Sequence, residues 1–165
     1  MMIKKQIKLT ANKLDVYNEV AKTTAYAGSK QLEADEHAYE HMFTTDEDRL
    51  MLERYFAEAC KEVVNSLPTS YIVEVSNYNT GTGIDLYADF VLTLEVPEAF
   101  PDNLSPSVEA SMFFYLTTYI TSQWFALQKS DMAIIYKEKS DVFKRDISVM
   151  LHRRSRPVRR RPRPF

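Results

Sequence analysis

The sequence predicts a mainly α-helical fold with a β-hairpin (α+β): a small bundle of about four helices, followed by an extended C-terminal arm. Three observations lead to this prediction. Apolar residues recur at three- and four-residue steps in four segments, which is the period of a helix with one buried face. Every second residue is apolar between Ile84 and Val96, which is the period of a strand. The last thirteen residues contain seven arginines, three prolines and no acidic residue.

Two helices are predicted in the first half of the chain. Residues 10–28 carry an apolar stripe that includes Leu14 and Tyr17. A second helix is expected over residues 45–67, because Thr45-Asp46-Glu47-Asp48 has the pattern of a capping box and Pro68 stops the helix. Its predicted apolar stripe consists of Leu52, Tyr55, Phe56, Ala59, Val63 and Leu67.

A β-hairpin is predicted at about residues 70–96. Its second strand, residues 84–96, alternates apolar residues with Asp85, Asp89, Thr93 and Glu95, which indicates one buried and one wet face. Residues 71–78 form the expected partner strand. The two glycines in Asn79-Thr-Gly81-Thr-Gly83 supply the freedom that a hairpin connection needs.

Two long helices are predicted to follow. Ser105-Pro106 offers a cap residue and a first-turn proline ahead of the third helix, residues 108–127. Apolar residues surround most of that helix, so we expect it to be contacted on most sides. A fourth helix begins near Ser130-Asp131 and runs directly into the arm. Its predicted stripe consists of Ile135, Tyr136, Val142, Phe143, Ile147, Met150 and Leu151.

Length and composition suit one domain, residues 1–152, and a separate basic arm, residues 153–165. The single cysteine, Cys60, excludes an intramolecular disulfide, and we expect it to be a core residue. The N-terminal residues lack the apolar run of a signal peptide. A membrane span at residues 108–127 is possible by length, but its Ser, Thr and Gln content favours a buried core helix, and no membrane partner is expected.

Catalytic motifs are weak in this sequence. His37-Ala-Tyr-Glu40-His41 has the spacing of an inverted zinc-protease motif, but a surface rich in Glu and His explains it as well. Asp46, Glu47 and Asp48 fit a helix start better than a calcium loop. No glycine-rich phosphate loop or serine elbow is present. We therefore expect neither an enzyme nor a bound cofactor or metal.

Charge is divided unevenly between the arm and the rest of the chain. The seven arginines give the arm a charge of +7, while residues 1–152 hold 14 basic and 23 acidic residues, a net charge of −9. Proline and arginine repulsion favour an extended arm that becomes ordered against a partner. The predicted partner-binding residues are Arg153, Arg154, Arg156, Pro157, Val158, Arg159, Arg160, Arg161, Arg163 and Phe165.

The arm has three interpretations. It can lie as an extended peptide in an acidic protein groove, with prolines lowering the cost of ordering and Val158 and Phe165 as apolar anchors. It can bind phosphates without sequence preference, since arginine forms bidentate pairs with phosphate. It can also be a solvated tail without a role. The first two interpretations are compatible with each other.

One family resemblance covers most of residues 45–152. Four features carry it: the acidic helix with its core Glu-Arg-Tyr-Phe-Ala-Glu-Ala-Cys-Lys-Glu-Val-Val (residues 53–64), the hairpin, the aromatic helix at 108–127 and the closing arm. Together they resemble the head-tail connector (adaptor or head-completion) proteins of tailed bacteriophages. The resemblance is one of layout more than of letters. It implies a structural protein of the virion, made in the host bacterial cytoplasm, that forms a ring, commonly of twelve copies, beneath the portal protein and beside other tail or connector proteins.

The resemblance also implies roles for particular residues. A ring needs a patch on one copy that meets a different patch on the next, and the apolar excess around Phe113, Tyr119 and Trp124 is the candidate oligomer interface. The arm would dock on the portal ring, and the acidic remainder would help to line a channel through which DNA slides. The alternative function is a nucleic-acid-binding accessory protein that uses the arm on phosphates.

Overall fold

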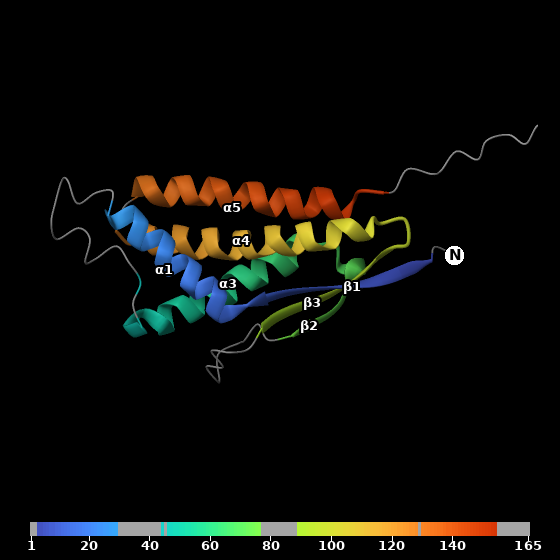
Figure 1. Ribbon diagram of the computed structural model, residues 1–165, viewed down its shortest axis with the longest axis horizontal. Helices are drawn as coiled ribbons and strands as arrows, with labels where there is room; N and C mark the ends of the chain where they lie inside the picture. The colour runs from blue at the N-terminus through green and yellow to red at the C-terminus, as the bar shows by residue number, and fades with distance from the viewer. Residues whose placement is uncertain (1–2, 30–43, 45, 77–88, 129, 155–165) are drawn as a thin grey trace, which may run out of the picture.

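The computed structural model describes residues 3–29, 44, 46–76, 89–128 and 130–154 (Figure 1). This part of the chain confirms the predicted fold class, because it is mainly helical with a small antiparallel sheet. Its helices are α1 (Lys13–Ser29), α3 (Arg49–Ser66), α4 (Ser105–Ala126) and α5 (Ser130–Leu151). Its strands are β1 (Lys4–Asn12), β2 (Ile72–Ser76) and β3 (Asp89–Pro97).

The sheet has β3 in its centre, with β1 and β2 antiparallel on either side. The predicted pairing of the two hairpin strands is confirmed, with Val75 opposite Leu92. The alternation predicted for the second strand is also confirmed from Phe90 to Val96, where every second residue is fully buried. The predicted turn and residues 84–88 lie outside the described residues.

The first strand corrects the sequence prediction. Residues 10–12 were expected to begin a helix, but they end β1, and the helix begins at Lys13. Ile7, Leu9 and Ala11 are buried on the face that they share with alternate residues of β3. The pairing partners lie 77 to 93 residues away, from Asn12↔Asp89 to Lys4↔Pro97. A propensity argument over neighbouring residues does not reveal so distant a partner.

The buried side of α1 also differs from the prediction. Tyr17 is buried as expected, but Leu14 is 39% exposed, and Val16 and Val20 are the fully buried residues. The helix packs on α4 and follows directly from β1, so the end of the strand sets which side faces inward.

The helix α3 confirms its predicted stripe but not its predicted start. Each of the six residues of that stripe is buried. The acidic residues before it form a short 3-10 turn, Asp46–Asp48, and α3 begins at Arg49 without a capping hydrogen bond from the Asp48 side chain. Thr45 lies outside the described residues. The helix ends before Pro68, as predicted, with Leu67 already in an extended conformation.

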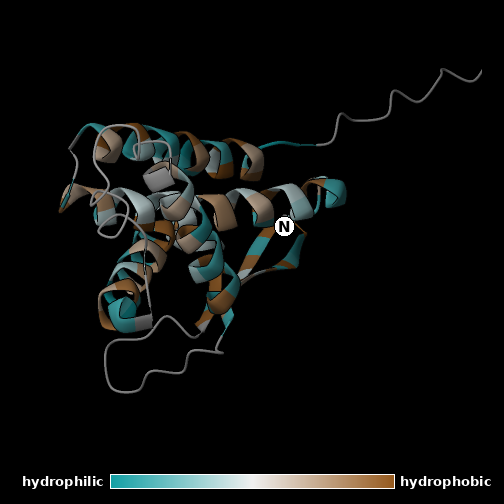
Figure 2. Cartoon of the chain, turned by 60° about the vertical axis from the view of Figure 1, so that its left-hand side comes forward, coloured by the Kyte–Doolittle hydropathy of each residue, from teal (hydrophilic) through white to brown (hydrophobic). Residues whose placement is uncertain are grey.

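The helix α4 lies at the centre of the described fold. It contacts α1, α3, α5 and β1, and Figure 1 shows α5 along one side of it and the sheet on another. Pro106 occupies its first turn, as predicted. Figure 2 shows brown and teal alternating along the strands and the amphipathic helices, which bury one face each. Because α1, α3, α5 and β1 all pack on α4, the expectation of contact on most sides of this helix is confirmed.

One charged residue of α4 has a clear structural role. The Glu109 carboxylate accepts a hydrogen bond of 2.8 Å from the backbone N–H of Thr10 in the edge strand β1. It thereby supplies an acceptor for a donor on the sheet edge, which otherwise depends on water. In the described part of the chain, each helix is too short or too polar to cross a membrane.

Candidate functional site

The first residues of the predicted partner-binding arm leave the body at the end of α5. Arg153 and Arg154 are exposed, and Arg156, Pro157, Val158, Arg159, Arg160, Arg161, Arg163 and Phe165 lie outside the described residues. The backbone N–H of Arg153 donates to the carbonyl of Met150 at 3.1 Å, which closes the last turn. The arm thus begins at a defined point.

Arg154 fixes that starting point against the sheet. One guanidinium nitrogen, Nη1, donates to the carbonyls of Leu151 at 3.0 Å and Arg153 at 2.9 Å, and the other, Nη2, donates to the Tyr71 hydroxyl at 3.2 Å. The Tyr71 ring also lies 6.0 Å from the His152 ring, centroid to centroid. Tyr71 ends the 3-10 turn that precedes β2, so the exit of the arm is held between α5 and the start of a strand.

The three residues of the candidate oligomer interface lie largely in the interior of the fold. Trp124 is 7% exposed, and Phe113 and Tyr119 are partly buried against the core. The apolar excess of α4 is therefore covered mainly by the chain's own elements. A contact of these three residues with another copy stays a prediction.

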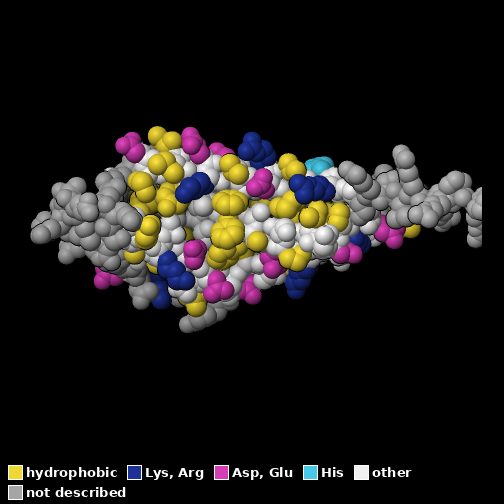
Figure 3. All heavy atoms as spheres, turned by 45° about the horizontal axis from the view of Figure 1, so that its top comes forward, with side chains coloured by type: hydrophobic (Ala, Val, Ile, Leu, Met, Phe, Trp, Pro, Cys, Tyr) yellow, Lys and Arg dark blue, Asp and Glu magenta, His cyan; other side chains and the backbone are white. Residues whose placement is uncertain are grey.

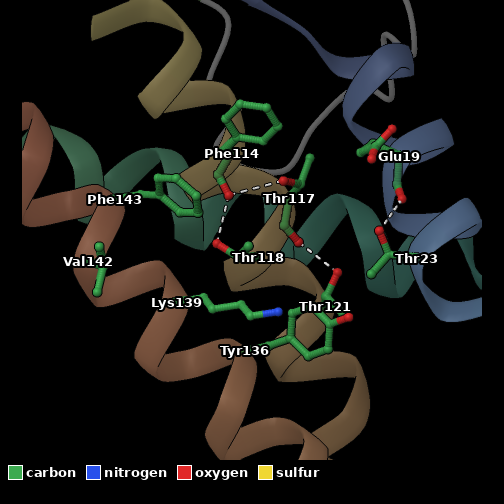
Figure 4. Close-up of a pocket in the computed structure, with 10 residues that line it drawn as sticks. All are labelled: Glu19, Thr23, Phe114, Thr117, Thr118, Thr121, Tyr136, Lys139, Val142 and Phe143. Atoms are coloured by element: carbon green, nitrogen blue, oxygen red, sulfur yellow. Dashed lines mark hydrogen bonds between the residues drawn. The ribbon is translucent and has the colours of Figure 1, made fainter. Parts of the chain in front are cut away.

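A groove lies where α1, α4 and α5 meet (Figure 4). We call it the Phe114 groove; its volume is about 480 Å³. Phe114 stacks on Phe143 with ring centroids 5.5 Å apart, and Phe114 remains 45% exposed. The lining residues are Glu19, Thr23, Phe114, Thr117, Thr118, Thr121, Tyr136, Lys139, Val142 and Phe143.

The Phe114 groove is more apolar than its four threonines suggest. Their hydroxyls donate to carbonyls of their own helices, for example Thr121 to Thr117 at 2.7 Å and Thr118 to Phe114 at 2.6 Å. The charged groups at the groove are Glu19 and Lys139, and the Lys139 ammonium lies 4.8 Å from the centroid of the Tyr136 ring. An apolar surface with a few placed charges suits binding of another molecule.

Residues of α5 beside this groove correct the predicted buried stripe. Ile135 is 46% exposed and Val142 is 43% exposed, although both were expected to be buried, whereas Ile147 and Leu151 are buried as predicted. The helix covers α4 with only one side. Figure 3 shows hydrophobic side chains gathered along the middle of this face with charged side chains around them.

A second, smaller groove lies between α4 and α5. We call it the Ile134 groove; its volume is about 370 Å³. Ser122, Gln123 and Ala126 of α4 line it together with Ala133, Ile134, Lys137 and Glu138 of α5. The Ile134 side chain is 57% exposed. Small side chains make much of the wall, which leaves a hollow beside Ile134.

A buried polar cluster joins α1 to α3. The Lys13 ammonium forms an ion pair with Glu53, and its side chain is only 2% exposed. The Tyr17 hydroxyl donates to the other Glu53 oxygen at 2.5 Å, and the Phe56 ring centroid lies 5.2 Å from the ammonium. The residues lie 36 to 40 positions apart, so no spacing rule indicates this contact in the sequence. The cluster holds the start of α1 on α3.

Burial disfavours the ionised forms of two side chains at this cluster, Tyr17 and the nearby Cys60. Burial raises the pKa of the Tyr17 hydroxyl above its ordinary value of 10.0, and Glu53 raises it further. Burial also raises the pKa of the Cys60 thiol above its ordinary value of 9.0, although Lys13 opposes the effect. A thiol that stays protonated is a poor nucleophile. Cys60 is fully buried, which confirms the expectation that it is a core residue.

These pKa shifts predict a loss of stability at high pH. Groups with a raised folded-state pKa stabilise the fold below the unfolded pKa, and that stabilisation is lost as pH rises. We expect the free energy of unfolding to fall from about pH 9 upward, by about 1.4 kcal/mol per pH unit for each group that ionises only when unfolded. Urea titrations between about pH 8 and about pH 11 measure this. Tyr17→Phe should reduce the slope, and a flat profile would contradict the prediction.

The described residues contain no group of three or more His, Cys, Asp and Glu placed to hold a metal ion. The motif His37-x-x-Glu40-His41 lies outside the described residues. Comparison with known proteins gives no match to a family model, to a curated protein or to a solved structure. The functional argument therefore depends on the chain's own residues.

Proposed function

We propose that this chain is a non-enzymatic structural protein of a tailed-phage virion, a ring-forming head-tail connector that docks on the portal ring through residues 153–165. The observation that carries the proposal is the point at which the arm begins. Seven arginines follow directly on α5, and the contact between Arg154 and Tyr71 fixes where they begin. A basic, proline-rich segment with a fixed start suits a tether between two assemblies.

Charge supports a protein partner for the arm. The body carries a net charge of −9 and the arm +7, so the arm is attracted to acidic surfaces and the body resists adhesion to DNA. Val158 and Phe165 give the arm apolar anchors, and its prolines reduce the entropy lost on docking. In a ring of about twelve copies, weak single arms add through effective concentration.

The alternative is a nucleic-acid-binding accessory protein. The density of arginine favours it, because seven guanidinium groups in thirteen residues can each pair with a phosphate. Such binding depends on composition rather than on the order of residues. Docking in a groove depends on order, because each proline and apolar anchor must reach its own position.

A shuffled arm separates the two functions. Residues 155–165 are either deleted or rearranged with unchanged composition, while Arg154 and its contact with Tyr71 are kept. For the connector, we expect both variants to lose binding to the purified portal protein of the same phage, measured by sedimentation after nuclease treatment.

For the alternative, the shuffled arm should keep the DNA binding of the natural arm. The logarithm of the affinity for duplex DNA should then fall with the logarithm of salt concentration with a slope of up to about −6 for seven contacts. Retention of the portal by the shuffled arm would contradict groove docking.

A further inference from the structure

The strand β1 forms one edge of the sheet, on the side of β3 that lies away from β2. The Ile3 carbonyl accepts a hydrogen bond of 3.0 Å from the Glu98 N–H just after β3, so Ile3 faces that strand. In an antiparallel pair this direction alternates along the chain. The Thr10 N–H accordingly points the other way, toward Glu109. Even-numbered residues of β1 therefore turn their backbone groups away from β3.

Three of these outward residues have no strand beside them in the described part of the chain. They are Lys4, Gln6 and Lys8, and the three residues are exposed. With one N–H and one C=O each, they present six backbone groups to water or to another strand. Glu109 occupies the next outward position along β1, so it marks the end of this stretch. We call residues 4–8 the open edge.

The opposite edge of the sheet is less suited to pairing with a further strand. The strand β2 has five residues against nine in β1, and its register with β3 shifts between Ile72 and Glu74. Such a bulge interrupts the row of hydrogen-bonding groups along an edge. The strand β1 pairs with β3 without a register shift, so the open edge keeps the spacing of a regular strand.

We propose that the open edge binds an extended, acidic segment of another protein, which adds a strand to this sheet. Backbone groups in a strand-like row pair with an extended chain and not with a helix. Charge selects an acidic chain, because Lys4 and Lys8 lie on the same face of β1. Lys4 shares its charge with Glu95 at 2.8 Å, whereas Lys8 has no ion pair among the described residues. The proposal depends neither on a ring nor on the arm.

The same charges disfavour two occupants from this chain itself. A second β1, paired antiparallel about Gln6, would place Lys4 of each copy opposite Lys8 of the other, and like charges in that position are destabilising. The arm carries seven arginines and would be repelled as well. Lysine on an edge strand is a common protection against unwanted pairing. Here it protects against basic strands and attracts acidic ones.

The spacing of the lysines predicts the pattern of the partner segment. In an antiparallel partner, the residues opposite Lys4 and Lys8 are four positions apart and lie on one face. Acidic residues are therefore expected at positions i and i+4 of the partner. The residue between them, opposite Gln6, exchanges two backbone hydrogen bonds with it, so proline is not expected there.

Two synthetic peptides with blocked ends test the proposal on the full-length chain. The acidic peptide is Thr-Glu-Val-Thr-Val-Glu-Thr, and its matched control is Thr-Lys-Val-Thr-Val-Lys-Thr. We expect the acidic peptide to bind with a Kd below about 1 mM and the lysine peptide to show no binding at that concentration. On binding, amide hydrogen exchange should slow at Lys4, Gln6 and Lys8. It should not change at Thr10, whose N–H already donates to Glu109.

Reversing one charge on the edge should reverse the preference for the peptides. In Lys8→Glu, the affinity for the acidic peptide should fall by at least about tenfold, and the lysine peptide should bind. Lys22→Glu makes the same change of charge on α1, at a side chain that is 77% exposed. This control should bind both peptides as the natural chain does.

Removing one backbone donor should abolish binding whatever the charge of the peptide. Gln6→Pro deletes an N–H that faces away from β3, a position at which an edge strand tolerates proline. Circular dichroism checks that this variant is folded. If it is not, the peptide Thr-Glu-Val-Pro-Val-Glu-Thr removes the same hydrogen bond from the partner's side, and it should not bind to the natural chain.

Three results would overturn the proposal. One is equal binding of the acidic and lysine peptides, and another is no binding of either, or slowed exchange only at residues outside the open edge. The third is a dimer of the natural chain that Gln6→Pro abolishes, which would assign the open edge to a second copy. Because every variant keeps residues 153–165, these results leave the docking of the arm to its own experiment.

Discussion

Replacing Glu53 with alanine is expected to lower the free energy of unfolding by about 3 kcal/mol. The substitution removes the carboxylate that neutralises the buried Lys13 ammonium and that accepts the Tyr17 hydrogen bond. The Phe56 ring remains beside the ammonium but supplies no countercharge. The value lies at the lower end for a broken buried pair, since the Glu53 side chain is 17% exposed and water can relieve part of the cost. Urea denaturation at neutral pH measures it.

A second glutamate on the same helix provides the control. Glu58 pairs with Arg54 at 3.2 Å, but both side chains are exposed, so Glu58→Ala should cost less than about 0.5 kcal/mol. Glu53→Gln keeps an acceptor for Tyr17 and removes only the charge, so it should fall between the two alanine variants. Equal losses for Glu53→Ala and Glu58→Ala would show that the cluster does not stabilise the junction of α1 and α3.

Trp124→Ala is expected to cost about 3 to 5 kcal/mol, because it removes a large side chain from a packed interior. Trp124 is 7% exposed on the central helix α4. Leu127, just beyond the end of that helix, is 64% exposed, and Leu127→Ala should change stability by no more than about 0.5 kcal/mol. Thermal and urea unfolding of both variants test the difference.

The dependence on protein concentration separates a core role for Trp124 from an interface role. A core residue lowers stability by the same amount at every concentration, whereas an interface residue lowers it only where the chain self-associates. We expect a loss that is independent of concentration. Unchanged unfolding of Trp124→Ala in dilute solution would contradict the placement of this residue in the core.

Sequence patterns predicted those parts of the fold in which one face of an element is uniformly apolar. The strand from Phe90 to Val96 and the stripe of α3 repeat with a clear period, so their burial followed from the sequence alone. The strand β1 was not predicted from the sequence. Its partner strand β3 is remote in sequence, and the alternating residues of β1 run directly into the apolar pattern of helix α1. Tertiary pairing decided between the two periods.

The candidate site was predicted less well than the fold. The arm stands out by composition, but the contact of Arg154 with Tyr71 joins residues 83 positions apart and depends on how the end of α5 lies against the turn before β2. The cluster of Lys13 and Glu53 depends on the approach of two helices in the same way. The apolar residues at 135, 142 and 149 have a visible seven-residue spacing, yet that spacing cannot tell a buried side from an exposed one.

Because Cys60 is fully buried, its thiol is a probe of how often the helices around it open. It is the only thiol in this sequence, it lies on α3 beside the contact with α1, and it stays protonated at neutral pH. A thiol reagent can therefore react only while the helices are apart, and its rate of incorporation reports how often they separate. A cysteine added to the surface reacts without that delay, so single-site labels can be attached without first removing the native thiol.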